Sequence, residues 1–312
     1  MIPTLRYARV VLPMSIKKEK VVIAGGAGFV GSHLSKKLIG LGYDVFIIDD
    51  LSAGKKTNVP KEAHFYNLNI CNYEGIKPIF DGATYVFHLA AIPSVEFSIH
   101  NPLVSHNTNV NGTLNVFDIA HKAGVSKVIF ASSSSLYGTQ KTKRLNEKMI
   151  PNPQSPYALQ KNIGEQYAKI YASLYALNTL SLRFFNIYGP GQNHEGAYAF
   201  VIAKFLKLKK EKKALEITGN GRQNRDFVHI DDVVAACLQA MKTKTTPGDF
   251  INIGGGKGVT INSIARMIGG TIRYIAPRIE PKDTESNNAK ALTILHWKPQ
   301  VSLKEGLKKL QS

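Results

Sequence analysis

Residues 21–31 of the chain read VVIAGGAGFVG. The apolar letters 21–24 predict a buried strand, and residues 33–41 have the apolar spacing of a helix. A strand, a tight turn and a helix form the phosphate-binding part of a dinucleotide site, because glycines let the backbone approach a pyrophosphate and the helix N-terminus presents free N–H groups. We therefore predict cofactor contacts at the turn and helix start: Gly25, Gly28, Phe29, Val30 and Gly31.

An acidic residue closes the next apolar run. Residues 45–48 are apolar and Asp49 follows them, about 20 residues after the glycine turn. A carboxylate in this place accepts hydrogen bonds from the adenosine ribose hydroxyls and repels the 2′-phosphate of NADP. The sequence therefore predicts NAD as the cofactor. The alternative is a glycine-rich turn that only packs a helix on a sheet.

Composition limits the class of protein. The chain has 312 residues, 44% of them hydrophobic, and no apolar run approaches the roughly 20 residues that span a bilayer. Only Cys71 and Cys237 are present, so we expect no disulfide framework and take a reducing cytoplasm as the default location. Residues 1–14 are expected to be an extension, either disordered or the product of a start assigned too early, since Met14 offers a more natural start.

The formal net charge is +18. Apart from KFLKLKKEKK at 204–213, the basic residues are spread along the chain, and the apolar letters in that run indicate an amphipathic helix with a solvated basic face. Neither nucleic acid nor a membrane is therefore expected as a partner. A basic cleft would suit an anionic substrate such as a nucleotide diphosphate.

Apolar runs alternate with helical stretches in the first part of the chain. The expected strands are 63–67, 84–90, 127–132 and 180–185, and the expected helices are 72–81, 101–123 and 154–177. This alternation predicts an α/β fold with a Rossmann-type doubly wound parallel sheet. After residue 191 the pattern becomes irregular, which predicts a smaller C-terminal α/β lobe. The expected domains are an NAD-binding domain, 15–185 with 226–242 returning to it, and a substrate-binding lobe, 186–225 and 243–312.

Tyr157 and Lys161 are four residues apart in a stretch that Pro156 opens as a helix. They share a face, so we expect the ammonium to lower the tyrosine pKa from about 10 towards neutrality. Such a tyrosine can act as a general acid/base on a sugar or alcohol hydroxyl. The preceding apolar run ends in serines 132–135, where a hydroxyl can stabilise a developing oxyanion. A surface pair and a polar loop are the alternatives, and the combination disfavours both.

In the order of its motifs, the chain resembles the extended short-chain dehydrogenases/reductases of the NAD-dependent epimerase/dehydratase family. The resemblance covers residues 20–310 and rests on GGAGFVGSHL (25–34), DDLS (49–52), HLAA (88–91), NVNGT (109–113), YALQK (157–161), RFFNIYGP (183–190), RDFVHIDD (225–232) and WKP (297–299). It implies an NAD-dependent enzyme with a UDP-sugar substrate, closest in pattern to UDP-glucose 4-epimerases. It also implies a homodimer formed through the helices 101–123 and 154–177.

The resemblance further implies the roles of individual residues. The catalytic residues it implies are Ser133, Tyr157 and Lys161, with Ser133 also contacting the substrate and the other two the cofactor. The further cofactor contacts are Asn69, Ile70, Leu89, Ala90 and Ala91. The substrate diphosphate would be bound by Asn186, Arg225 and Arg278. No metal site is expected.

The chain departs from the family pattern at several positions. Asn69 stands where the family usually has an acidic residue that contacts adenine N6, although an amide oxygen can still accept that hydrogen bond. Pro93 replaces a lysine of some galactose epimerases. Ser134 and Ser135 stand where sugar 4,6-dehydratases carry an Asp-Glu pair, and two serines cannot supply the acid and base that dehydration needs. Thr284 aligns with the substrate gatekeeper, where a small residue leaves room for an N-acetyl group.

The sequence thus predicts a nucleotide-sugar 4-epimerase. It would interconvert UDP-glucose and UDP-galactose through a 4-keto intermediate and bound NAD, with the N-acetyl forms as further substrates. The alternatives are a UDP-glucuronate epimerase or decarboxylase, a net dehydrogenase or reductase of the same fold, and a non-catalytic NAD-binding or RNA-associated protein.

Overall fold

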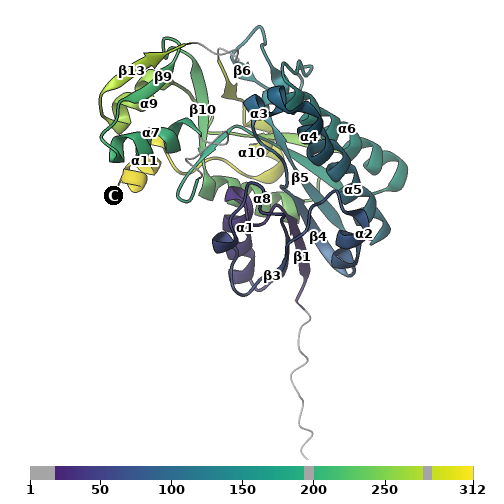
Figure 1. Ribbon diagram of the computed structural model, residues 1–312. Coiled ribbons are helices and arrows are strands. Elements are labelled where there is room, and N and C mark those ends of the chain that lie inside the picture. Colours follow the sequence, from purple (N-terminus) through teal and green to yellow (C-terminus); the bar gives the residue numbers. More distant parts are fainter. Residues whose placement is uncertain (1–17, 193–199, 277–282, 312) are drawn as a thin grey trace, which may run out of the picture.

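A parallel sheet of seven strands runs through the centre of the molecule in the order β11-β7-β5-β4-β1-β2-β3 (Figure 1). The structure is a computed structural model and describes residues 18–192, 200–276 and 283–311, so the expectation for residues 1–14 lies outside it. The strands of the central sheet are β1 (Lys20–Ala24), β2 (Asp44–Ile48), β3 (His64–Tyr66), β4 (Ala83–His88), β5 (Lys127–Ser133), β7 (Thr179–Phe184) and β11 (Asp249–Ile253). All neighbouring pairs are parallel, which confirms the predicted fold class.

Helices cover both faces of this sheet. One face packs against α1 (Phe29–Gly40), α8 (Ile230–Lys242) and α10 (Ala289–Leu295), and the other against α2 (Tyr73–Ile76), α5 (Gly112–Lys122) and α6 (Pro156–Tyr175). In β1, Val21 and Ile23 belong to the first core, while Val22 and Ala24 belong to the second. The strands read as continuous apolar runs because both of their faces are buried.

The helix expected over 101–123 is divided in the structure. α3 (Val95–His100) and α4 (Pro102–His106) precede a π-helical segment, Asn107–Asn111, which continues into α5. α6 follows the expectation for 154–177 closely. Ser155 caps it, since its Oγ accepts a hydrogen bond from the Ala158 N–H, and Pro156 occupies the first helical position.

A smaller lobe holds most of the C-terminal part. Its elements are β8 (Asn186–Tyr188), β10 (Asn224–His229), β12 (Gly258–Thr260), β9 (Leu215–Thr218), β13 (Ile272–Ile275), α7 (Val201–Lys210), α9 (Ile261–Ile268) and α11 (Leu303–Gln311). The strands form a three-stranded sheet, β12-β10-β8, and a two-stranded sheet, β13-β9. The short strands β6 (Arg144–Leu145) and β14 (Glu285–Ser286) pair beside the lobe. The core of the lobe lies between its helices and strands, around Phe205, Ile217 and Ile264.

Three segments differ from the predicted division of the chain. β11 pairs with β7 at the edge of the central sheet, and α10 packs on a face of that sheet, although residues 243–312 were all expected in the lobe. β10 pairs with β8 and β12, so of residues 226–242 only α8 packs on the central sheet. Each strand is short and pairs with residues distant in sequence, and local periodicity carries no information on that pairing. The functional division into two domains stays a prediction.

The glycine turn leaves no space for side chains where β1 approaches α1. A Cβ at Gly31 would lie 2.2 Å from the Gly25 carbonyl oxygen, whereas a Cβ at Gly40, the last residue of the same helix, would meet nothing within 4 Å. The two positions therefore form a matched pair for substitution.

We expect Gly31→Ala to lower the free energy of unfolding by about 2 kcal/mol or more, because the added methyl group must displace backbone. Gly40→Ala should leave stability unchanged or raise it by up to about 1 kcal/mol, because alanine is the better helix former. Urea denaturation of both variants measures the difference. Equal stabilities would show that the turn is not closely packed.

Candidate active site

A cleft of about 1200 Å³ opens at the carboxyl ends of the central strands and extends into the smaller lobe. Residues that follow β1, β2 and β4 line one part of it, and the ends of β5 and β7 line the middle. Ligands of open parallel sheets bind at this edge, where the strand order reverses between β1 and β4. Pockets for small molecules are typically about 300–1,000 Å³, so this cleft is larger than is usual for a single small ligand.

Backbone conformation at the glycine turn fits a dinucleotide. Gly25 has φ +87°, and a Cβ there would lie 2.5 Å from the Ala90 nitrogen. Gly28 is the N-cap of α1 and has no side chain to cap it. The first N–H groups of this helix are therefore open to an anionic ligand. Gly25 and Gly28 line the cleft together with the other predicted contacts Phe29, Val30, Gly31, Ile70, Leu89, Ala90 and Ala91.

Asp49 holds the glycine turn as well as lining the cleft. Its Oδ2 accepts a hydrogen bond from the Ala27 N–H at 2.9 Å, and its Oδ1 accepts one from the Leu51 N–H at 2.8 Å. Burial raises the pKa of this carboxyl group, while the backbone hydrogen bonds oppose the shift. A carboxylate oxygen can accept a second hydrogen bond, so Asp49 can also bind ribose hydroxyls.

Asn69 forms a pair with a second carboxylate. Its Nδ2 donates to Asp50 Oδ2 at 2.6 Å, and its Oδ1 accepts from the Cys71 N–H at 2.8 Å. Asp50 lines the cleft, whereas Asn69 is the one predicted site residue of the described ranges that does not. The amide therefore orients Asp50, a residue to which the sequence reasoning assigned no role although it follows Asp49 directly.

The three predicted catalytic residues come together where α6 crosses the end of β5. Ser133 ends the strand, and Tyr157 and Lys161 lie on the helix face above it. The Ser133 hydroxyl lies close enough to the Tyr157 phenol to lower its pKa. The Lys161 Nζ donates to the Ala131 carbonyl at 2.8 Å and lies 6.0 Å from the centroid of the Tyr157 ring.

The pKa expectation for Tyr157 is wrong for this protein chain. Burial raises the pKa of Tyr157 to about 12, with the Ser133 hydroxyl opposing the shift. Burial also lowers the pKa of Lys161 to about 7. Loss of solvation disfavours the charged form of each group, and this effect exceeds the attraction between them. A tyrosinate in this site therefore needs a further positive charge beside it.

Ser135 orients the hydroxyl of Ser133, a contact that the sequence reasoning missed. Its N–H and its Oγ–H both donate to Ser133 Oγ, at 3.2 and 2.9 Å. Because Ser133 Oγ accepts both of these bonds, its own proton is left to be donated, which suits a stabiliser of negative charge on oxygen. The run of serines at 132–135 is the sequence signal for this contact.

The residues predicted to bind the substrate lie farther along the cleft. Asn186 and Arg225 line it, with Asn186 Nδ2 donating to the Asp226 carbonyl at 2.8 Å. Thr284 lines it too; its side chain is 8% exposed, and its Oγ1 has no hydrogen-bond partner among the described residues. Arg278 lies outside the described residues.

This arrangement can bind an anionic nucleotide ligand and exchange a proton with a hydroxyl group beside a dinucleotide. In the parts of the chain that the structure covers, no group of three His, Cys, Asp or Glu side chains could hold a metal ion. None of the helices in those parts combines the length and apolar composition needed to cross a bilayer.

The known proteins that this chain resembles are NAD-dependent or act on nucleotide sugars, which agrees with a nucleotide-binding cleft. The model of the NAD dependent epimerase/dehydratase family matches residues 21–254. A UDP-glucuronate 4-epimerase of Thermodesulfobacterium geofontis is 32% identical and covers 92% of this chain and 94% of its own. A UDP-glucose 4-epimerase of Mycolicibacterium smegmatis is 33% identical, covering 93% and 96%. The crystal structure of a UDP-glucose 4-epimerase from Thermotoga maritima with UDP-glucose superposes with a TM-score of 0.89 at 38% identity, covering 93% and 96%.

The buried lysine makes stability depend on pH in a specific direction. The pKa of Lys161 falls from 10.5 to about 7 on folding, so between these values the unfolded chain binds more protons and the free energy of unfolding rises with pH. Lys161→Met removes this dependence. In NAD-free protein we expect the variant to be more stable than wild type by about 5 kcal/mol below pH 7. Urea denaturation from pH 6 to pH 10 should show the difference shrinking, and a constant difference would contradict the assignment.

Proposed function

Because the chain belongs to the NAD-dependent epimerase/dehydratase family, we propose that it is a nucleotide-sugar 4-epimerase acting on a UDP-hexose. It is an NAD-dependent enzyme of nucleotide-sugar chemistry, with UDP-sugar 4-epimerases among its relatives. The choice of a 4-epimerase of UDP-glucose and UDP-galactose is the proposal. The observation that carries it is the joining of Ser133, Tyr157 and Lys161 with Arg225 in one cleft.

Each side chain has a role that follows from its geometry. The chemistry that bound NAD supplies is reversible hydride acceptance at the sugar C4, with a positive charge on its oxidised nicotinamide ring. Tyr157 in its ionised form accepts the proton of the C4 hydroxyl, and Ser133 donates a hydrogen bond to the same oxygen. Loss of that proton and of the C4 hydride leaves a 4-keto sugar. Return of both with the other face of the ring presented gives the epimer.

The substrate must stay bound while its sugar ring rotates to present the other face. Arg225 suits the diphosphate, because a guanidinium offers several donors in fixed geometry, and Asn186 lies beside it in the cleft. Anchoring at the diphosphate leaves the sugar free to present either face to the same tyrosine. The contacts to the diphosphate therefore matter as much to the reaction as the acid/base residues.

The identity of the residues around Ser133 argues for epimerisation over dehydration. Ser134 and Ser135 both line the cleft, and Ser135 is committed to hydrogen bonds with Ser133. Neither has an acidic side chain that could move a proton at C5 or C6. Thr284 is small and lines the same cleft, which supports acceptance of N-acetyl sugars.

UDP-glucuronate is the main alternative substrate, and a relative with that activity is 32% identical. A 4-epimerase of UDP-glucuronate would use the same three catalytic residues. A decarboxylase or a net dehydrogenase would instead release carbon dioxide or accumulate free NADH. The products formed distinguish these alternatives directly.

The purified enzyme should convert UDP-glucose or UDP-N-acetylglucosamine to the C4 epimer, detected by NMR, without net NADH release. Tyr157→Phe should lower kcat by at least about 100-fold, as expected for loss of a general acid/base, while the amount of bound NAD stays the same. A protein that epimerises none of the three nucleotide sugars, UDP-glucuronate included, would rule the function out. Full activity of Tyr157→Phe would remove that residue from its role.

We also propose a homodimer formed through α3, α4 and α6. These helices lie against one another and present exposed apolar side chains: Ile99, Leu103, Val104, Leu159, Ile170 and Leu174. Contiguous exposed apolar surface favours association. A second copy of the same chain, using the same helices, would cover it symmetrically.

Leu103→Asp should shift the protein from dimer to monomer in analytical ultracentrifugation, because a charge in an apolar interface lacks a partner. Ile150→Asp is the matched control, since Leu103 and Ile150 are each 84% exposed and Ile150 lies outside these helices. Wild-type protein that sediments as a monomer at micromolar concentration would contradict the proposal.

A further inference from the structure

Two successive residues of β5 are bound by residues of α6, and a third lies beside one. The carbonyl of Ala131 accepts from Lys161 Nζ, and the hydroxyl of Ser132 donates to Glu165 Oε1 at 2.5 Å. The hydroxyl of Ser133 lies close enough to Tyr157 to lower its pKa. The three helix residues are spaced by four, so they share one face of α6. Glu165 therefore continues the row formed by the two catalytic residues, one turn farther along.

Glu165 is held from the other side by a buried arginine. Arg183 Nε donates to Glu165 Oε1 at 2.8 Å, and Nη2 donates to Oε2 at 2.6 Å. Both side chains are 1% exposed. Burial disfavours the charged guanidinium, but Glu165 outweighs that effect and raises the pKa of Arg183. The pair is thus a charged, bidentate contact whose geometry leaves the carboxylate little freedom.

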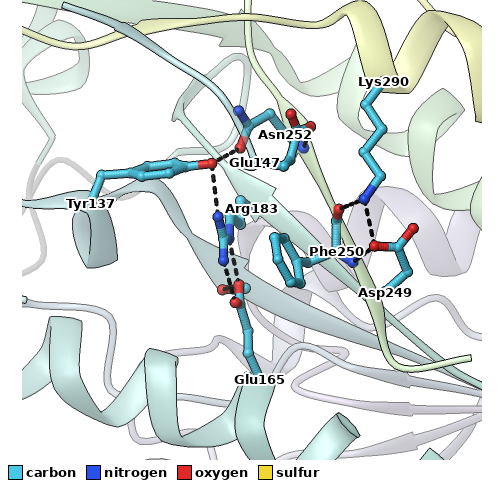
Figure 2. Close-up of polar contacts among 9 residues, drawn as sticks. Tyr137, Glu147, Glu165, Arg183, Asp249, Phe250, Asn252 and Lys290 are labelled. Atoms are coloured by element: carbon cyan, nitrogen blue, oxygen red, sulfur yellow. Dashed lines mark hydrogen bonds and ion pairs between the residues drawn. The ribbon is translucent and has the colours of Figure 1, made fainter. Parts of the chain in front are cut away.

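Aromatic rings and a third hydrogen bond also hold the arginine in place (Figure 2). The guanidinium carbon lies 3.9 Å from the centroid of the Phe250 ring and 4.8 Å from that of Tyr137. Arg183 Nη1 donates to the Tyr137 hydroxyl, which donates to Asn252 Oδ1, each at 2.8 Å. The network therefore connects α6 and the end of β5 through β7 to the edge strand β11.

We propose that Glu165 is a positioning residue for the catalytic groups, acting through Ser132. The carboxylate fixes the position of the end of β5 along the axis of α6. This position sets the separation between Ser133 on the strand and Tyr157 on the helix. The inference rests on the proposed function, in which these two groups act on one oxygen atom.

Stability alone does not explain the arrangement. A buried ion pair contributes little net stability compared with well-packed apolar residues of the same volume, because both charges lose their solvation. Apolar packing, unlike a hydrogen bond, does not fix the position of the end of β5 relative to α6. The bond from Ser132 to Glu165 defines where the strand end lies, immediately beside the residue that must meet the reacting oxygen.

Ser132→Ala tests this with little risk to folding, since it removes one hydroxyl and leaves the ion pair in place. Ser181→Ala is the matched control: Ser181 is fully buried on the neighbouring strand β7, and its Oγ has no hydrogen-bond partner among the described residues. Ser132→Thr keeps the hydroxyl. The holoenzyme variants are compared by kcat and KM for UDP-glucose, and by amide hydrogen exchange of the segment 127–138.

We expect Ser132→Ala to lower kcat by about tenfold while KM changes by less than about twofold, because misplaced catalytic groups slow the chemical step more than binding. Exchange in 127–138 should become several times faster. Ser132→Thr should restore both values, and Ser181→Ala should change neither.

Exchange in 127–138 that matches the control overturns the inference, and so does an equal loss of kcat in Ser132→Ala and Ser181→Ala. A loss that falls wholly on KM also overturns it. Wild-type enzyme inactive on every UDP-sugar would instead refute the proposed function. The exchange measurement needs no turnover, so it still decides whether Glu165 positions the strand end.

Discussion

The parallel pairing of β1 with β4 is the constraint on which the rest of this structure depends. It aligns Ala24 with His88, and the Leu89 N–H donates to the Ala24 carbonyl at 2.8 Å. The turn after β1 and the segment after β4 consequently run so close together that only glycine fits at position 25. Because all strands of the central sheet are parallel, the cleft residues that end or follow β1, β2, β4 and β5 meet at this one edge.

Burial at that edge has two consequences for the chemistry. It makes the phenol of Tyr157 harder to ionise and the ammonium of Lys161 easier to deprotonate. A positive charge beside the phenol would lower the pKa of Tyr157 again. Negative phosphates in the cleft would raise the pKa of Lys161 again. Burial by itself therefore favours the neutral phenol at Tyr157, and the proposed acid/base role requires a positive charge beside it.

The site could be predicted in some respects and not in others. The glycine turn, Asp49 and the Tyr157–Lys161 pair were predicted because each depends on residues close together in sequence, and the structure places all of them in the cleft. The position of β11 and the direction of the Tyr157 pKa shift were predicted incorrectly. Strand pairing and desolvation both depend on neighbours that are distant along the chain, such as β7 for β11.

The sequence by itself determined the type of fold, the nucleotide turn and the chemical class of the reacting groups, since local backbone preference and side-chain chemistry suffice for these. Only the tertiary structure decided how those groups are held. Ser132, Glu165 and Arg183 come from three different elements, and no spacing along the chain shows that they meet. Their contact arises from the packing of α6 across the sheet, because geometry between elements is set by the whole core and not by any one segment.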